Sequence, residues 1–182
     1  MNDMSQPPPD IPALAARIEA FLKALPTHLP RGHSDTEWTT QIKCDIGQIG
    51  LDAGLLATAS GYPTPKDREW LYDLIWFQNS PEKHLEKLVM ALESEWSRDP
   101  DEILYDFEKL LVARAPLKVM IFQDNGGNLD ALWQMFEKSM QTYAHPDPTE
   151  LYVWAAFQET RHEFMVKMAR VEELLTGRRQ LI

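Results

Sequence analysis

Apolar residues recur at helical spacing in the first third of the chain. A first helix is predicted from Pro12 to Leu25, ended by Pro26. A longer second helix is predicted to begin at Ser34 or Asp35, either of which can cap it. The apolar face of that second helix consists of Trp38, Ile42, Ile46, Ile49, Ala53 and Leu56. Three glycines within it predict a kink or a break, and they are Gly47, Gly50 and Gly54.

Further along the chain, short runs of aromatic and branched residues alternate with helical patterns. Four strands are predicted, REWLYDLIWFQ at 68–78, LEKLVMALESEW at 85–96, LKVMIF at 117–122 and LYVWAAF at 151–157. The helix predicted after the second strand has the apolar face Ile103, Leu104, Phe107, Leu110 and Leu111. The helix predicted after the third strand has the apolar face Leu129, Leu132, Trp133, Phe136, Met140 and Tyr143. The residues after Glu163 fit either a helix or an edge strand.

The order of these elements predicts an α/β fold. The first two strands are joined by the short turn NSPEKH and are therefore antiparallel, whereas the strand–helix–strand units favour parallel neighbours with right-handed crossovers. We expect a mixed central sheet flanked by helices on both faces, with an extra N-terminal helix. The length of 182 residues fits a single domain over 11–182, preceded by a proline-rich, disordered segment at 1–10.

Composition and charge restrict the partners. No segment approaches the roughly 20 consecutive apolar residues that span a bilayer, and the N-terminus has no signal-peptide pattern. The single cysteine, Cys44, has no partner for an internal disulfide, so we expect a cytoplasmic protein without membrane contact. The formal net charge of −10 argues against strong unaided binding to nucleic acid, which normally requires a basic surface. A homodimer or a protein partner would assist such binding.

Two glutamates at the end of the second strand stand out in the segment LVMALESEW. Side chains alternate across a strand, so Glu93 and Glu95 are predicted to share one face with Val89 and Ala91. On the preceding strand, Asp73 lies among hydrophobic neighbours. Because Asp73 and Glu93 are equally far from the turn, we expect them to lie opposite each other.

Three carboxylates in one partly buried patch require compensation. Like charges repel and burial penalises each of them, so the cost must be offset by protonation, by ion pairs with Arg68 or Arg98, or by a metal ion. Oxygen ligands suit a hard divalent cation such as Mg²⁺ or Mn²⁺. Both a metal site and a structural cluster of ion pairs are consistent with the pattern.

The succession of Asp73, the Glu93-x-Glu95 pair, a helix and the strand LKVMIF resembles the PD-(D/E)XK nuclease superfamily in its E-x-E variant. The likeness covers about residues 34–158 and implies the restriction-endonuclease-like fold. It also implies Mg²⁺-dependent hydrolysis of phosphodiester bonds in nucleic acid. In that case Asp73 and Glu93 would bind the metal, Glu95 would be a further ligand or the general base, and Glu37 would be an accessory acid.

The sequence departs from the family pattern at two positions. Tyr72 replaces the proline before Asp73, and Glu95 replaces the motif lysine that helps to deprotonate the attacking water. Either Glu95 acts as the base or Lys109 supplies the lysine, although Lys109 is predicted nearly opposite the buried face of its helix. The alternatives are a non-catalytic member of the same fold that serves as an interaction or regulatory subunit, and an unrelated α/β binding protein whose acids are structural.

Overall fold

The computed structural model of the protein describes residues 8–29, 31–60, 70–124 and 128–178. The helices are α1 (Ile11–His28), α2 (Asp35–Asp52), α3 (Pro100–Val112), α4 (Leu129–Thr142) and α5 (Val171–Arg178). The strands are β1 (Leu56–Ala59), β2 (Leu74–Asn79), β3 (Leu85–Glu95), β4 (Leu117–Asp124), β5 (Leu151–Gln158) and β6 (Glu163–Arg170). Most of the predicted disordered N-terminus and Arg68 lie outside the described residues.

The six strands form one mixed sheet in the order β1-β2-β3-β4-β5-β6. Strand β2 pairs antiparallel with both β1 and β3. Strands β3, β4 and β5 are parallel to one another, and β6 returns antiparallel to β5. The parallel pairs are joined through α3 and α4, which are the crossovers that the sequence predicts. The predicted α/β class with a mixed sheet is therefore confirmed.

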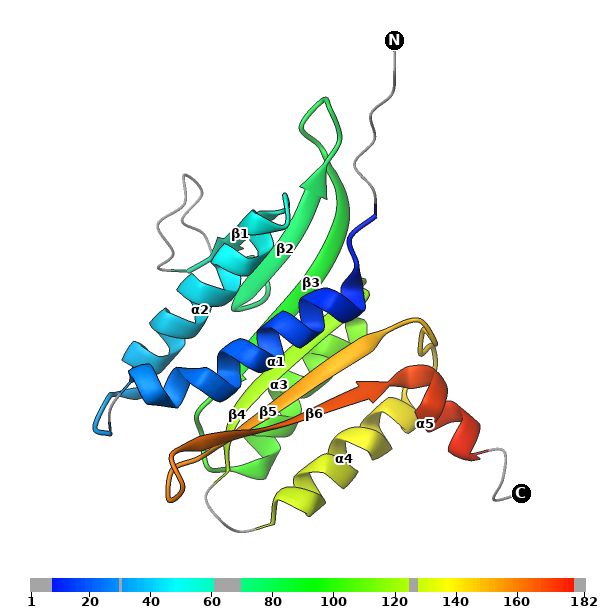
Figure 1. Cartoon of the computed structure of the whole chain (residues 1–182). Helices are drawn as coiled ribbons and strands as arrows, with labels where there is room; N and C mark the ends of the chain where they lie inside the picture. Colours follow the sequence, from blue (N-terminus) through cyan, green and yellow to red (C-terminus); the bar gives the residue numbers. More distant parts are fainter. Residues whose placement is uncertain (1–7, 30, 61–69, 125–127, 179–182) are drawn as a thin grey trace.

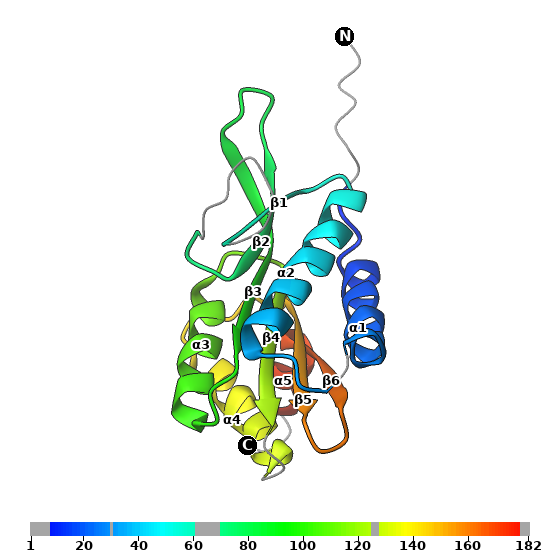
Figure 2. The same ribbon diagram turned by 90° about the vertical axis from the view of Figure 1, so that its left-hand side faces the viewer.

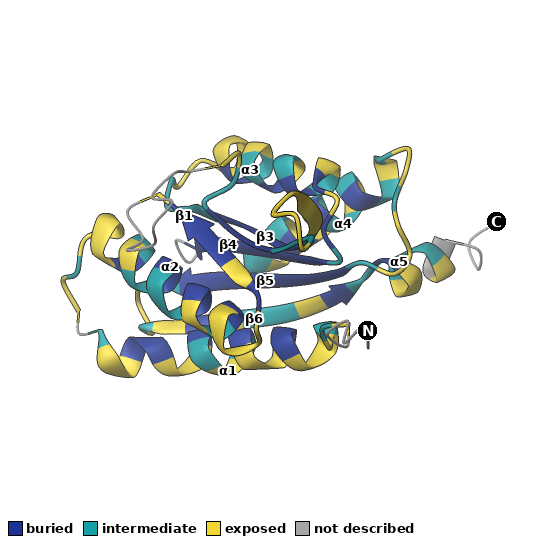
Figure 3. Ribbon diagram, turned by 90° about the horizontal axis from the view of Figure 1, so that it is seen from above, coloured by how far each residue is buried: buried dark blue, intermediate teal, exposed yellow. Residues whose placement is uncertain are grey.

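Helices cover both faces of the sheet. Figure 2 shows the sheet nearly edge-on, with α1 and α2 on one side and α3 on the other. Viewed from above, the helices expose one side and turn their buried residues toward the strands (Figure 3). Each face has its own hydrophobic core, one beneath α1 and α2 and one beneath α3 and α4. Strands β4 and β5 are buried on both faces, which is typical of parallel strands in α/β proteins.

Helix α1 continues beyond the predicted end. Pro26 lies inside its last turn and is buried together with Leu25, and the helix ends at His28. Proline costs a helix one backbone hydrogen bond, but this loss occurs near the C-terminus, where few further turns depend on it. The predicted end at Leu25 is therefore wrong.

Helix α2 is shorter than predicted, and β1 was missed. The helix passes through its first two glycines without a break and ends at Asp52, where Gly54 adopts a left-handed φ of 77°. Leu56 belongs to the edge strand rather than to the helix. Gly50 has a packing role, because a Cβ there would lie 2.5 Å from Nε1 of Trp76 on β2.

The hairpin of β2 and β3 projects from the body of the sheet (Figure 1). Its first strand begins at Leu74, six residues later than predicted, because Leu71 has a φ of 75° that no strand accommodates. In β3, Trp76 pairs with Met90 and Phe77 pairs with Leu88, which leaves one extra residue as a β-bulge at Val89. The bulge reverses the alternation, so Val89 packs beneath α1 and α2, whereas Ala91 packs beneath α3. The prediction that Val89 shares a face with the two glutamates is therefore wrong.

The C-terminal region combines both alternatives that its sequence left open. Residues Glu163–Arg170 form the edge strand β6, and Val171–Arg178 form α5 directly after it. Among the described residues, no helix is both long and apolar enough to cross a bilayer.

Candidate functional site

The predicted acids lie where β2 begins and β3 ends. Leu74 pairs with Leu92 and Ile75 with Ala91, so the next position in this register sets Asp73 against Glu93, as the hairpin spacing predicts. Asp73 itself precedes the strand. Beyond Glu95, the chain passes into α3, which packs over β3 and β4. The acids thus lie between the mouth of the hairpin and a helix.

Glu93 is the most deeply buried of these acids, with 2% of its surface exposed. Its Oε2 forms an ion pair with Nζ of Lys109 at 3.0 Å. Its Oε1 is buried and has no hydrogen-bond partner among the described residues. Burial raises the pKa of Glu93 to about 8; Lys109 opposes this shift, and the charges of Asp73 and Asp106 add to it.

Lys109 reaches this cluster from α3, contrary to the prediction from helical geometry. Its ammonium contacts Glu93 and also Oδ1 of Asp106 at 2.8 Å. Burial lowers the pKa of Lys109, but the hydrogen bonds and charges of Asp106 and Glu93 outweigh burial and raise it. The four-carbon stem of lysine can extend along a helix surface and carry its charge well away from the backbone position. A helical wheel does not capture that reach.

Glu95 lies on the same side of β3 as Glu93. Its Oε1 accepts a hydrogen bond from the backbone N–H of Ser97 at 2.5 Å. The pKa of Glu95 is raised by burial, is lowered by that bond, and is raised again by the neighbouring Asp106 and Glu102. The structure therefore brings together Glu93, Glu95 and Asp106, because Lys109 contacts Glu93 and Asp106, and Glu95 interacts with Asp106.

Asp73 is held toward the other face of the sheet. Its Oδ2 accepts hydrogen bonds from the backbone N–H and from Oγ of Ser94, both at 2.8 Å. Its Oδ1 forms an ion pair at 2.9 Å with Lys43, a buried residue of α2. The ion pair that the sequence assigned to Arg68 or Arg98 is thus made by Lys43, and Arg98 instead pairs with Glu159. The three carboxylates predicted to converge are divided between two faces.

The carboxylate of Glu37 forms hydrogen bonds at the N-terminus of its own helix, α2. Its Oε2 accepts hydrogen bonds from the backbone N–H and Oγ of Ser34 at 2.7 and 2.8 Å, and Ser34 Oγ accepts one from the backbone N–H of Glu37. This capping box satisfies the first turn of α2. Hydrogen bonds from Ser34 to this carboxylate lower the pKa of Glu37. Among the described residues, Glu37 forms no hydrogen bond or ion pair with Asp73, Glu93 or Glu95.

Sequence reasoning missed three members of the site. Asp106 had a usable signal, because it stands one turn before Lys109 and such pairs meet on a helix surface. Tyr72 is close enough to Glu93 and Lys109 for both charges to affect it, and burial is the largest cause of its raised pKa. Lys43 had no signal of its own, because it lies among the buried positions of α2, where the pattern leads one to expect an apolar residue.

The chain was compared with protein-family models and with curated proteins, and neither comparison found a match. Within the part of the chain that the structure describes, no group of three or more His, Cys, Asp or Glu side chains is arranged to hold a metal ion. A metal ion here would therefore depend on one or two protein ligands. Magnesium is commonly bound in that way, with water and substrate phosphate oxygens completing its coordination.

Proposed function

We propose that the protein is a divalent-metal-dependent nuclease of the PD-(D/E)XK type that hydrolyses phosphodiester bonds in nucleic acid. The observation that carries this proposal is the buried Oε1 of Glu93, which has no partner among the described residues. A buried carboxylate oxygen without a partner is costly, and a cation or a proton is what compensates it. The antiparallel hairpin followed by a helix and a parallel strand also agrees with the topology that the resemblance implies.

The residues at the end of β3 fit a magnesium or manganese ion. Glu93 would be the first ligand, because its Oε1 is available while Lys109 holds Oε2. Asp73 would be the second, once its carboxylate leaves Lys43 and turns from the α2 face of the sheet toward Glu93. A divalent ion bound there supplies a more acidic water and neutralises charge on the phosphate.

Glu95 and Lys109 have separate roles in this proposal. The carboxyl group of Glu95 has a raised pKa, and a raised pKa makes its carboxylate a stronger base toward water. Lys109 carries a positive charge close to Glu93 and Asp106. It would replace the motif lysine in stabilising the negative charge of the phosphate. Glu37 is not used, because its carboxylate caps α2.

A cleavage assay tests the proposal. The wild type is incubated with single-stranded DNA, duplex DNA and RNA in the presence of Mg²⁺ or Mn²⁺, and we expect products that disappear when the metal is chelated. Glu93→Gln should lower the cleavage rate by about 100-fold or more, because several kcal/mol of charge stabilisation are lost. Glu86→Gln on the exposed half of the same strand makes the same charge change and should leave the rate unaltered. Cleavage that survives in Glu93→Gln would remove Glu93 from the reaction.

A second candidate function has its own supporting observation. Lys43 and Lys109 already neutralise Asp73 and Glu93, and a protein that has lost catalysis can retain such pairs as structural contacts. The protein would then act as a non-catalytic interaction or regulatory subunit. Calorimetric titration with Mn²⁺ separates the two functions: the nuclease binds the ion and Glu93→Gln weakens that binding, whereas a purely structural cluster gives no specific heat of binding.

A further inference from the structure

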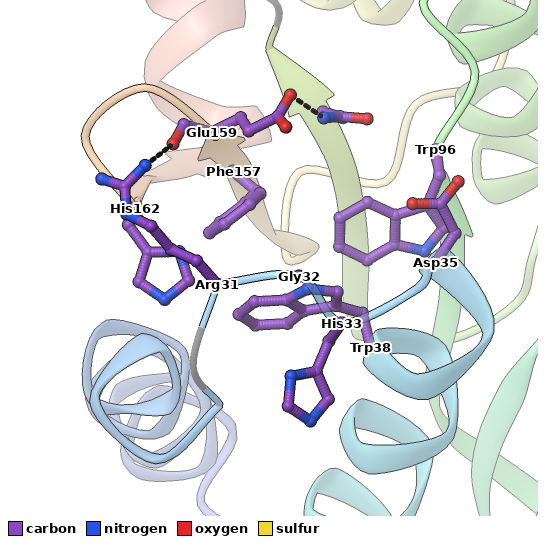
Figure 4. A pocket seen from close by; sticks show the side chains of 10 residues that line it. Arg31, Gly32, His33, Asp35, Trp38, Trp96, Phe157, Glu159 and His162 are labelled. Atoms are coloured by element: carbon purple, nitrogen blue, oxygen red, sulfur yellow. Dashed lines mark hydrogen bonds between the residues drawn. The ribbon is translucent and has the colours of Figure 1, made fainter.

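A cavity of about 140 Å³ opens at the end of the sheet where the parallel strands finish (Figure 4). Trp96 from the end of β3, Gln123 from β4 and Phe157 from β5 line it. The connector before α2 and the turn between β5 and β6 complete the wall. In open α/β sheets, ligands characteristically bind outside the carboxyl ends of the strands.

Aromatic rings form one wall of this cavity, where Trp96 and His162 are partly exposed and Trp38 and Phe157 are buried. The ring centroids of Trp38 and Phe157 lie 4.7 Å apart, and Trp96 lies 6.2 Å from each of them. His162 meets Phe157 edge-on at 5.6 Å. A cavity of about 150 Å³ accommodates one benzene-sized ring, so the volume fits a single planar ring system.

Polar groups beside the rings can pair with the edge of such a ring system. Nε2 of Gln123 donates to Oε2 of Glu159 at 3.3 Å, and Arg98 contacts that same oxygen at 3.4 Å. Both contacts are at the long end of the hydrogen-bonding range and are therefore easily exchanged for a ligand. Arg31 also lines the cavity, and its guanidinium donates to the backbone carbonyl oxygens of Glu159 at 3.3 Å and Thr160 at 3.1 Å.

We infer that this cavity binds one unpaired nucleobase, so that the substrate class is single-stranded nucleic acid. Stacking on an aromatic side chain is open to every base, but only when the base is not paired in a duplex. The nearby charges are balanced, with Arg31 and Arg98 against Asp35 and Glu159. Stacking rather than phosphate contact should therefore provide most of the affinity, and its salt dependence should be weak.

The position of Trp96 connects the cavity to the proposed reaction. Trp96 follows Glu95 in the chain, so a nucleic-acid strand with one base in the cavity would have its sugar-phosphate backbone near the end of β3. The inference rests on the proposed function only in treating the bound strand as the substrate. Binding of the strand can be measured without any cleavage.

The test is a binding measurement with fluorescently labelled oligonucleotides and the Glu93→Gln protein in a chelator. Single-stranded DNA and RNA of the same sequence and the corresponding duplex form the three arms. We expect both single strands to bind at least fivefold more tightly than the duplex, and an oligonucleotide with abasic positions to bind at least fivefold more weakly than its parent. A duplex that binds as tightly as the single strands, equal binding of the abasic oligonucleotide, or no binding at all would overturn the inference.

Matched tryptophan variants, each made in the Glu93→Gln protein, locate the site. Trp96→Leu should weaken single-strand binding at least fivefold, whereas Trp70→Leu should change it less than twofold, because Trp70 is exposed beside Phe77 on a different surface. Unaltered binding by Trp96→Leu would contradict the inference. Binding that depends on Trp96, together with a wild type that does not cleave any of the nucleic acids, would retain the inference and remove the proposed function. Cleavage that is equally fast in the wild type and in Trp96→Leu made without Glu93→Gln would retain the proposed function and remove the inference.

Discussion

The Lys118→Met variant is expected to lose about 3 kcal/mol of unfolding free energy. Lys118 lies in β4 with 0% of its surface exposed, and its Nζ contacts Oε1 of Glu150 at 2.6 Å and the hydroxyl of Tyr152 at 3.1 Å. Removal of one partner leaves a partly buried carboxylate without its cation, and such a break costs about 3–5 kcal/mol. The lower end applies because 13% of the Glu150 side chain remains in contact with solvent.

Equilibrium unfolding in urea measures this loss. The control is the double variant Lys118→Met with Glu150→Met, because replacement of both ions by apolar residues of similar volume is often nearly neutral. The double variant should recover most of the stability. A single variant within about 1 kcal/mol of the wild type would show that the pair is not coupled to the fold in this way.

The second large effect concerns the pH dependence of stability at Glu93. Because the pKa of Glu93 is about 8 in the folded protein, against 4.5 as its ordinary value, the folded state keeps a proton that the unfolded state releases between these pH values. Stability from this group therefore falls as the pH rises from about 4.5 to about 8, and it is level above that range. The full difference is about 5 kcal/mol.

Glu93→Gln removes that dependence. Unfolding curves at several pH values should show the variant gaining stability relative to the wild type through this window, with the largest gain at and above pH 8. Glu86→Gln, exposed on the same strand, should follow the wild type. A constant difference between Glu93→Gln and the wild type across the window would show that Glu93 titrates normally in the folded protein.

The architecture was largely predictable from the chain. The period of the apolar residues located the main helices and all four predicted strands, although β2 begins later than predicted. The lengths of the connections indicated antiparallel pairing in the hairpin and parallel pairing across α3 and α4. Strand β1 was missed because it has only four residues and follows α2 with apolar residues still in helical register. A single left-handed glycine, Gly54, decided where that helix ended.

The site was predictable in position but not in orientation. Counting outward from the turn was enough to set Asp73 against Glu93. The alternation of side chains along a strand did not predict the direction of Asp73, because Asp73 precedes the strand and its hydrogen bonds to Ser94 turn it toward α2. The lysines that pair with these acids, Lys43 and Lys109, come from helices on opposite faces of the sheet. A local sequence pattern does not indicate which side chains from distant helices will meet at the sheet.

The pairing of Glu93 with Lys109 has a consequence for metal binding. Lys109 neutralises Glu93 and Lys43 neutralises Asp73, and the proposed cation would contact both carboxylates. Binding of the ion therefore requires at least Lys43 to move. Displacement of a charged group costs affinity, and we therefore expect binding in the range typical of a weakly held catalytic magnesium rather than of a structural metal.

The most direct measurement of the central claim is anomalous X-ray scattering from crystals grown or soaked with manganese. We expect an anomalous peak at bonding distance from Oε1 of Glu93, with Asp73 released from Lys43 and with no such peak in Glu93→Gln crystals prepared in the same way. Crystals that contain manganese elsewhere but keep Lys43 on Asp73 and leave Oε1 of Glu93 without the ion would contradict it.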